Sequence, residues 1–401
     1  MTAFAFVPNL RLAVGGEPVP DDVRLSVAAV RCDTGMEGVD QAEVMLANDG
    51  FRFLDDPRFA VGRSLALDLG SVDRGMSRVF TGEIVAKAAE FSSSSGASLS
   101  ITAQDRRHRM QDGTKARWFA IPVPTVGNFS LPDIVTAGLV SAENLMVPIF
   151  DPVGAALSII LGGVEAIAVV TDPGTAQKMI RKQADESDHD FLRRIAKENG
   201  WDMVVEHGGA VGGHLLRFQS SLDRLEPVLT VRRGRDLIDF SARISKVGVL
   251  EAVTIGIWVP SIKMIFTVTL GFDWDLMALT LEIYPGSIPL GLGQSGRMVI
   301  DEPASPFTAP RKLVSELIPR LNRRLTANLT MPGEPLLRAG EVIRIEDAGE
   351  EFGGLYRIVH VTHRLDEAGF RSELELRKDV WFGSVPAPEQ GAVPLRVTPF
   401  A

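Results

Sequence analysis

A plan of short β-strands that occurs twice is the feature that most constrains how this chain can fold. In the first hundred residues apolar side chains recur at every second position, as at Leu65, Leu67 and Leu69. A period of two indicates strands that bury one face. Polar turns at 48–50 and 92–96 separate such runs, as short antiparallel strands require. The start of the chain is therefore predicted to be a small all-β unit.

The end of the chain repeats this order of glycine turn, strand, polar turn and strand. The separations are 278 residues from Gly62 to Gly340, 274 from Ile84 to Ile358, and 275 from Leu99 to Leu374. A drift of a few residues is what loop insertions and deletions produce. The spacing predicts two similar β-barrels in one chain. The alternative, left open at this point, is a chance likeness between two β meanders.

The stretch between the two β units carries helical signals. Ser187 is placed to cap a helix over 187–199, with Asp190 three residues later, and Gly200 suits a left-handed C-cap. A hairpin is predicted next, over 201–218, around a glycine-rich tip.

Two further segments complete the expected elements. Leucines recur every four residues over 311–327 and predict a second helix, which Pro319 is expected to kink or shorten. The last stretch, 386–401, is rich in proline and is predicted to be an extended tail.

The composition is that of a globular protein of two or three domains. The 401 residues are 45% hydrophobic and carry 42 Lys+Arg against 51 Asp+Glu, a net charge of −9. Because affinity for phosphate backbones depends on Lys and Arg, this balance argues against nucleic acid as the main partner. The single cysteine, Cys32, excludes an intrachain disulfide and a thiolate metal cluster. Residues 1–16 lack the layout of a secretory signal, so no export peptide is expected.

One apolar run conflicts with this soluble picture. Residues 152–171 are long enough to span a bilayer, and Glu165 is their only charge. The interrupting Gly154, Gly162 and Gly163, the central carboxylate and the absence of flanking cations argue against a span. A buried or subunit-facing insertion is the favoured interpretation.

A glycine motif suggests a cofactor but lacks the necessary context. Residues 291–296 (GLGQSG) match the dinucleotide pattern GxGxxG, which binds pyrophosphate only between a strand and a helix N-terminus. Here the sequence Asp301-Glu302-Pro303 stops any helix within one turn. A glycine loop is predicted, and no cofactor is expected.

Two histidine pairs are the candidate metal ligands. His207 and His214 flank the glycine-rich tip beside Glu206, but a third protein ligand is missing. His360 and His363 are three residues apart on a predicted strand, which directs their rings to opposite faces. No metal site is predicted.

No catalytic residues are predicted either. The chain lacks the GxSxG nucleophile elbow. Asp273 and Asp275, on either side of Trp274, could serve as acid and base in sugar cleavage, but chance pairs are expected among 51 acidic residues.

Two motifs resemble a known family. Residues 186–201 (ESDHDFLRRIAKENGW) closely resemble the signature ESDxxFLxRLAxExG of the phage late control protein D family. These are tail-hub proteins of contractile phages and related contractile injection systems, and they are similar to the N-terminal half of type VI secretion spike proteins. Residues 333–340, 354–363 (GLYRIVHVTH) and 369–370 resemble the family's C-terminal pattern. Neither motif is catalytic in the family.

The resemblance implies a mainly β fold with α+β insertions. Each chain is expected to contribute two similar tube-type β-barrel domains, so that a homotrimer forms a pseudo-sixfold ring. Such a hub would join a hexameric inner tube protein to a trimeric spike protein and contact other baseplate components. An acidic chain suits a lumen that must not hold a polyanion tightly.

The repeat and the resemblance together predict the domain organisation. The expected parts are a first tube-like barrel at 1–115, an α+β connecting domain at 116–225 with the insertion 152–171 and the helix 187–199, a second barrel at 226–250 plus 325–385, an inserted domain at 251–324, and the tail 386–401. The insertion and the apolar stretch 253–292 are larger than a minimal hub needs and are expected to cover a trimer interface or meet a neighbouring baseplate protein. The spike is expected to be a separate chain.

The expected function is structural. A non-enzymatic baseplate hub would assemble in the bacterial cytoplasm and become part of a phage tail or injection particle. It would bind no specific nucleic acid sequence and have no stable membrane span. Two alternatives stay open, a tail-tip glycan hydrolase that uses Asp273 and Asp275, and a membrane-associated protein anchored through 152–171.

Overall fold

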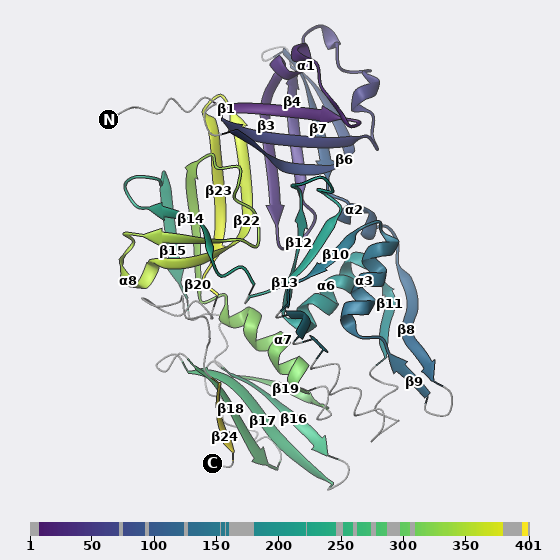
Figure 1. Ribbon diagram of the computed structural model, residues 1–401, viewed down its shortest axis with the longest axis vertical. Coiled ribbons are helices and arrows are strands. Elements are labelled where there is room, and N and C mark those ends of the chain that lie inside the picture. The colour runs from purple at the N-terminus through teal and green to yellow at the C-terminus, as the bar shows by residue number, and fades with distance from the viewer. Residues whose placement is uncertain are drawn as a thin grey trace.

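The computed structural model has four parts, an N-terminal unit, a C-terminal unit, a middle region and an inserted region (Figure 1). The structure describes residues 8–71, 75–92, 96–123, 127–152, 154–156, 158–159, 180–221, 223–245, 252–259, 263–273, 278–286, 297–304, 309–379 and 395–399. The fold is mainly β and is dominated by one large, mostly antiparallel sheet.

Six main strands of the N-terminal unit surround one apolar core. The strands are β1 (Pro8–Val14), β3 (Val27–Gly35), β4 (Gln41–Ala47), β5 (Ser64–Ser71), β6 (Gly75–Ser92) and β7 (Gly96–Gln104). Alternate side chains such as Leu65, Leu67 and Leu69 are fully buried in this core, as their spacing predicts. Short elements fill the connections: β2 (Glu17–Pro18), α1 (Asp21–Leu25), α2 (Arg107–Met110) and two 3-10 turns, η1 (Asp49–Phe51) and η2 (Pro57–Phe59).

The C-terminal unit also has six strands and its own core. They are β14 (Pro227–Arg232), β15 (Asp239–Ile244), β20 (Leu325–Pro332), β21 (Val342–Glu346), β22 (Gly354–Asp366) and β23 (Gly369–Arg377), and the short helix α8 (Gly349–Phe352) lies between β21 and β22. Tyr356, Ile358 and Val361 are among the fully buried side chains of this core.

The two units share one strand order. The N-terminal order is β1-β5-β6-β7-β4-β3, and the C-terminal order is β14-β21-β22-β23-β20-β15. In the N-terminal unit all pairings between neighbours in this order are antiparallel. In the C-terminal unit they are also antiparallel, except that β14 pairs in parallel with β21. The internal repeat is therefore present in the strand topology.

Backbone details match as closely as the strand order. Gly62 and Gly340 have φ of 88° and 86°, and each N–H donates to the carbonyl of the matching isoleucine, Ile84 at 2.8 Å and Ile358 at 2.9 Å. A bulge follows each isoleucine, between Ile84 and Ala86 and between Ile358 and His360. These features fix the equivalence of β6 with β22.

The bulges also correct the predicted alignment of the last strand. Ile84 pairs with Ala103, and Ile358 pairs with Leu376, so these two partners are equivalent. Leu374 then corresponds to Ile101 instead of Leu99, a shift of two residues. A shift of two keeps every side chain on the same face, which is why alternation alone did not reveal it.

The two units are joined directly through their sheets. The second half of β22 pairs antiparallel with β3, from His360 opposite Gly35 to Leu365 opposite Val30. Leu365 and Phe370 of the C-terminal unit pack against the core of the N-terminal unit. We call this contact the β22–β3 junction.

The middle region is an α+β structure. Strands β10 (Val147–Phe150), β13 (Leu215–Ser220) and β12 (Trp201–Glu206) form one sheet, and β11 (Arg181–Glu186), β8 (Lys115–Val123) and β9 (Gly127–Ser130) form another. Helices α3 (Asp133–Glu143) and α6 (Asp188–Asn199) share a core with them. The predicted helix is confirmed in detail, because Ser187 Oγ accepts from the Asp190 N–H at 3.0 Å and Gly200 ends the helix with φ of 68°. The hairpin predicted over 201–218 is present as β12 and β13.

The inserted region has a sheet of five strands covered by one helix. The strands are β16 (Ala252–Val259), β17 (Met264–Asp273), β18 (Ala278–Pro285), β19 (Arg297–Ala304) and β24 (Leu395–Pro399), and the helix is α7 (Ala309–Leu321). Leu313 and Leu317 of α7 pack on Val253 and Ile255 of β16.

Two predictions about segment ends are corrected here. The helix predicted over 311–327 ends at Leu321, soon after Pro319, and Leu325 already begins β20. In the tail, Leu395–Pro399 is a strand paired in parallel with β18, so this part belongs to the inserted sheet.

Most of the apolar run 152–171 lies outside the described residues. Its described beginning, at 152, 154–156 and 158–159, is helical. Among the helices within the described ranges, none combines the length and apolar character that a membrane crossing requires.

Candidate functional site

Two buried ion clusters fix the middle region to the two β units. The N-terminal cluster contains Asp40, Asp105, Arg107 and His207, and the C-terminal cluster contains Asp202, Arg357, Arg377 and Asp379. Since isolated charges are costly to bury, each cluster must be hydrogen-bonded throughout to be tolerated.

In the N-terminal cluster, Arg107 bridges two carboxylates. One of its nitrogens, Nη2, lies 2.8 Å from Asp40 Oδ1 and 2.8 Å from Asp105 Oδ2. Asp105 also accepts from the Asp40 N–H at 2.7 Å, and Asp40 accepts from the Gly35 N–H at 2.8 Å. Arg107 is therefore held by the ends of β3, β4 and β7 together.

His207 brings the middle region into this cluster from the tip of the β12–β13 hairpin. Its Nε2 donates to Asp40 Oδ2 at 2.8 Å, and its Nδ1 accepts from the Thr81 N–H at 3.1 Å. The ring also stacks on Phe80 with centroids 5.1 Å apart. This histidine is a structural link between two parts of the chain.

The electrostatics of the N-terminal cluster keep Asp40 and Arg107 charged. Burial raises the pKa of Asp40, but the Arg107 charge and the His207 hydrogen bond outweigh it, so the pKa is lowered overall. Burial likewise disfavours charged Arg107, yet Asp105 and Asp40 raise its pKa above the usual value. The pair is an ionised structural bridge and has no proton to exchange near neutral pH.

The C-terminal cluster is built in the same way. Asp379 accepts from Nε of Arg357 and, at 2.7 Å, from Nε of Arg377. Arg377 Nη2 reaches Asp202 of β12 at 2.6 Å. The remaining donors of fully buried Arg357 bind backbone carbonyls, including Gly340 at 2.7 Å and Ser221 at 2.9 Å. Burial raises the pKa of Asp379, but Arg377 and Arg357 lower it overall.

The motif at 186–201 has a structural role that the contacts explain. Asp188 is buried, and its carboxylate accepts from Lys115 Nζ at 2.6 Å, Arg117 Nη2 at 2.8 Å, and the side-chain amides of Gln183 and Asn144, each at 2.9 Å. The carboxylate thus connects α6 to β8, to β11 and to the end of α3.

The C-terminal motif positions one loop against β22 and β23. His363 is buried, accepts at Nδ1 from Ser372 Oγ at 2.9 Å and donates from Nε2 to the Leu337 carbonyl at 3.1 Å. A Cβ at Gly333 would lie 2.1 Å from the ring of Phe370, so only glycine fits there.

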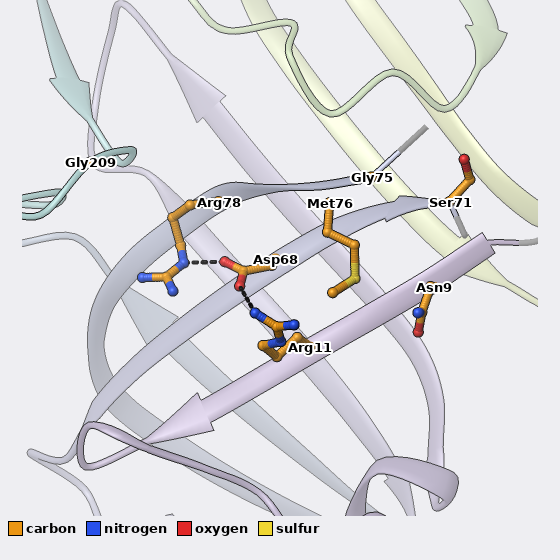
Figure 2. A pocket seen from close by; sticks show the side chains of 8 residues that line it. All are labelled: Asn9, Arg11, Asp68, Ser71, Gly75, Met76, Arg78 and Gly209. Atoms are coloured by element: carbon orange, nitrogen blue, oxygen red, sulfur yellow. Dashed lines mark hydrogen bonds and ion pairs between the residues drawn. The ribbon is translucent and has the colours of Figure 1, made fainter. Parts of the chain in front are cut away.

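The described surface has several hollows, and two of them bear on the sequence candidates. Figure 2 shows a hollow of about 550 Å³ on β1, β5 and β6, where Asp68 lies between Arg11 and Arg78 and is ion-paired with both. A larger groove of about 900 Å³ lies between α6, α7 and the C-terminal unit, and its described charges include Arg193 and Arg377.

The candidate metal ligands are not brought together. His207 is buried in the N-terminal cluster, whereas His214 Nδ1 faces the Leu145 carbonyl at 3.3 Å. His363 is buried and His360 is half-buried. Within the described ranges, no group of three or more His, Cys, Asp or Glu side chains could hold a metal ion.

The other sequence candidates fall partly outside the described residues. Residues 291–296 and Asp275 lie outside them, and Asp273 ends β17. The segment after the glycines is strand β19, so the helix that a dinucleotide site needs does not follow. One carboxyl with a raised pKa is Glu341, whose burial favours the neutral form, and it lines neither hollow.

Sequence reasoning missed both ion clusters. Their only local trace is an acidic residue just after the last strand of each unit, with an arginine two positions away, as in Asp105–Arg107 and Arg377–Asp379. The partners Asp40, Asp202 and Arg357 come from distant segments, and alternation patterns carry no information about them.

The comparisons with known proteins concern the fold. No family model and no curated protein matches the chain. The 43 kDa tail protein of prophage MuSo2 from Shewanella oneidensis is similar in structure, with a TM-score of 0.60 at 14% identity over 92% of this chain and 98% of that one. A tail protein from Neisseria meningitidis has a TM-score of 0.60 at 13% identity over 95% of this chain and 100% of that one.

A third similar structure comes from a secretion system. An E. coli protein, described as a component of the type VI secretion system with structural similarity to bacteriophage T4 tail proteins, has a TM-score of 0.54 at 11% identity. The match covers 96% of this chain and 80% of the E. coli protein. At these identities the likeness concerns the fold, and at that level the resemblance drawn from the two motifs is confirmed. This chain has the fold of phage tail proteins and of a type VI secretion component.

Proposed function

We propose that this protein is a structural, non-enzymatic hub of a phage tail baseplate or a contractile injection system. The observation that carries the proposal is the internal repeat, two units of one strand order joined edge to edge through the β22–β3 junction. The similarity of the whole fold to phage tail proteins supports the same conclusion.

In this proposal the segments 1–115 and 226–250 plus 325–385 act as tube-like barrels. Three chains then present six similar units, which suits a homotrimer that adapts a hexameric tube to a trimeric spike. The middle region holds the two units in a fixed relation through the two ion clusters. The partners are the inner tube protein, the spike and other baseplate proteins, and the protein is found in the particle after assembly in the cytoplasm.

The direct test is the mass of the purified chain in solution. Light scattering should give about three times the 43.4 kDa chain mass, and the mass should rise when a candidate spike protein is added. A chain that stays monomeric at micromolar concentration and ignores the spike would contradict the hub.

A further inference from the structure

Among the described strands, the repeat reveals two edges that lack the partner their counterparts have. In the β22–β3 junction, the second half of β22 uses one edge for β23 and the other for β3. The equivalent half of β6, from Ala86 to Phe91, pairs with β7, but no described strand occupies its other edge. Likewise β3 pairs with β4 and β22, whereas its counterpart β15 pairs only with β20 among the described strands.

The exposure of the side chains also indicates that these two edges lack a partner among the described residues. Val30, Cys32 and Thr34 of β3 are 1%, 0% and 6% exposed, because the junction covers them. The strand pairings make Phe240, Ala242 and Ile244 their counterparts on β15, and these three side chains are only half-buried. On the other edge, residues 86–91 of β6 are exposed throughout, including Phe91 at 60%. This edge carries Lys87 and Glu90 besides its alanines, and the exposed Phe91 ring contacts the exposed Phe51 ring at 5.4 Å between centroids. An exposed edge strand is a template for pairing with another chain.

We infer that these two edges bind each other between copies of this chain, so that β6 of one copy pairs antiparallel with β15 of the next. Copying the register of the β22–β3 junction places Ala89 opposite Ala242, Phe91 opposite Phe240 and Ala88 opposite Arg243. This inference rests on the proposed function for the number of copies, three.

The side chains fit this register. Leu365, which corresponds to Phe91, packs against the core of the N-terminal unit, so Phe91 should pack against the core of the neighbour's C-terminal unit. A hollow of about 550 Å³ lined by Leu237, Phe240 and Phe352 is open beside β15 and can receive it. Glu90 falls diagonally from Arg243 on the other face, within reach of an ion pair.

The contact is heterologous, since it joins a different patch on each copy, and such contacts generate rings when the rotation closes. Within one chain the two edges lie at opposite ends of the path from β15 to β6, with six strands between them (Figure 1). The contact therefore joins different chains.

Disulfide cross-linking tests the register. In a Cys32→Ala background, Ala89→Cys with Ala242→Cys puts two thiols on directly paired positions, where Cα atoms about 4.5–5.5 Å apart suit a disulfide. Mild oxidation should give bands of two and three chain masses. The matched control, Ala88→Cys with Ala242→Cys, has its thiols on opposite faces and should not cross-link. Mixing the two single-cysteine chains should give only the two-chain band.

Two results separate this inference from the proposed function. A solution that light scattering shows to be trimeric but that does not cross-link would overturn the β6–β15 contact and leave the hub intact. A monomer that does not cross-link would overturn both. As a second variant, Phe91→Asp should weaken association at least tenfold, whereas Leu25→Asp, at an exposed leucine on α1, should not change it.

Discussion

At the scale of single residues, stability depends on a few buried polar groups that each tie several segments together. Asp188 accepts hydrogen bonds from four side chains on two strands, β8 and β11, and at the end of α3. Removing it leaves Lys115 and Arg117 with only the more exposed Glu143 as a shared anion. Both cations are partly solvent-exposed and can be rehydrated, which limits the loss.

We therefore expect Asp188→Ala to lower the free energy of unfolding by about 2 kcal/mol. Urea denaturation followed by circular dichroism measures this. Asp185→Asn is the matched control, because Asp185 is exposed, has φ of 53° and tolerates asparagine there, so it should cost less than about 0.5 kcal/mol. Equal losses in the two variants would contradict the anchoring role of Asp188.

The buried side chain of His363 predicts that the free energy of unfolding depends on pH. Burial lowers its pKa to about 4, despite the hydrogen bond to Leu337. In the unfolded chain the His363 side chain is protonated near pH 6.5, whereas in the folded chain it stays neutral until about pH 4. The contribution of this group to the free energy of unfolding is therefore present above pH 6.5 and is lost as the pH falls from 6.5 to 4. The loss amounts to about 3 kcal/mol at most.

The measurement is the free energy of unfolding at intervals from pH 7 to pH 4. His363→Gln should flatten the slope in this window, while His214→Gln, at the hairpin tip, should keep it. A wild-type slope that survives in His363→Gln would assign the pH dependence to other groups.

At the scale of elements, the repeat offers an internal control for backbone strain. Gly62 and Gly340 have nearly the same positive φ and make the same hydrogen bond. They differ in surroundings, because a Cβ at Gly62 meets nothing within 4 Å, whereas one at Gly340 lies 2.4 Å from Gln219 Nε2.

Gly62→Ala should therefore cost only the backbone strain, about 1 kcal/mol, and Gly340→Ala should cost clearly more. Thermal unfolding of the two single variants measures the difference. A smaller effect at Gly340 than at Gly62 would show that the Gln219 side chain moves aside freely.

The strand β24 gives a second prediction at this scale. It covers the outer edge of β18 through pairings from Leu279–Leu395 to Ile283–Pro399. Truncation after residue 394 should speed amide hydrogen exchange in β18, while β16, which lies between β17 and β19, should keep its protection. Unchanged exchange in β18 would contradict the pairing.

How much the sequence predicted also differs between elements. The helix at 187–199 and the repeat were predictable because caps and alternation are local signals. The end of α7 was placed too late, since the leucine spacing continues through Leu325 into β20 and masks the boundary. The ion clusters were not predictable, because the links that join separate segments come from residues far apart in the sequence, as Arg377 meets Asp202 and Arg107 meets Asp40.

At the scale of the whole molecule, the proposed ring contact is made by main-chain hydrogen bonds and apolar side chains, with Glu90 and Arg243 at its margin. Salt screens exposed charges strongly, with a Debye length of about 3 Å at 1 M, but leaves apolar contacts intact. The trimer mass from light scattering should therefore stay the same between 0.1 M and 1 M NaCl. Dissociation at high salt would indicate an interface built mainly from ion pairs.

The β22–β3 junction also has a mechanical consequence. Six consecutive residue pairs hold the two units together, and Phe370 of one unit is buried in the core of the other. A pull along the strand direction loads all these hydrogen bonds in shear at the same time, whereas a peeling force would break them one by one. The junction between the two units of each chain therefore resists deformation along the strand direction. A force applied to one unit is transmitted to the other with little bending at the β22–β3 junction.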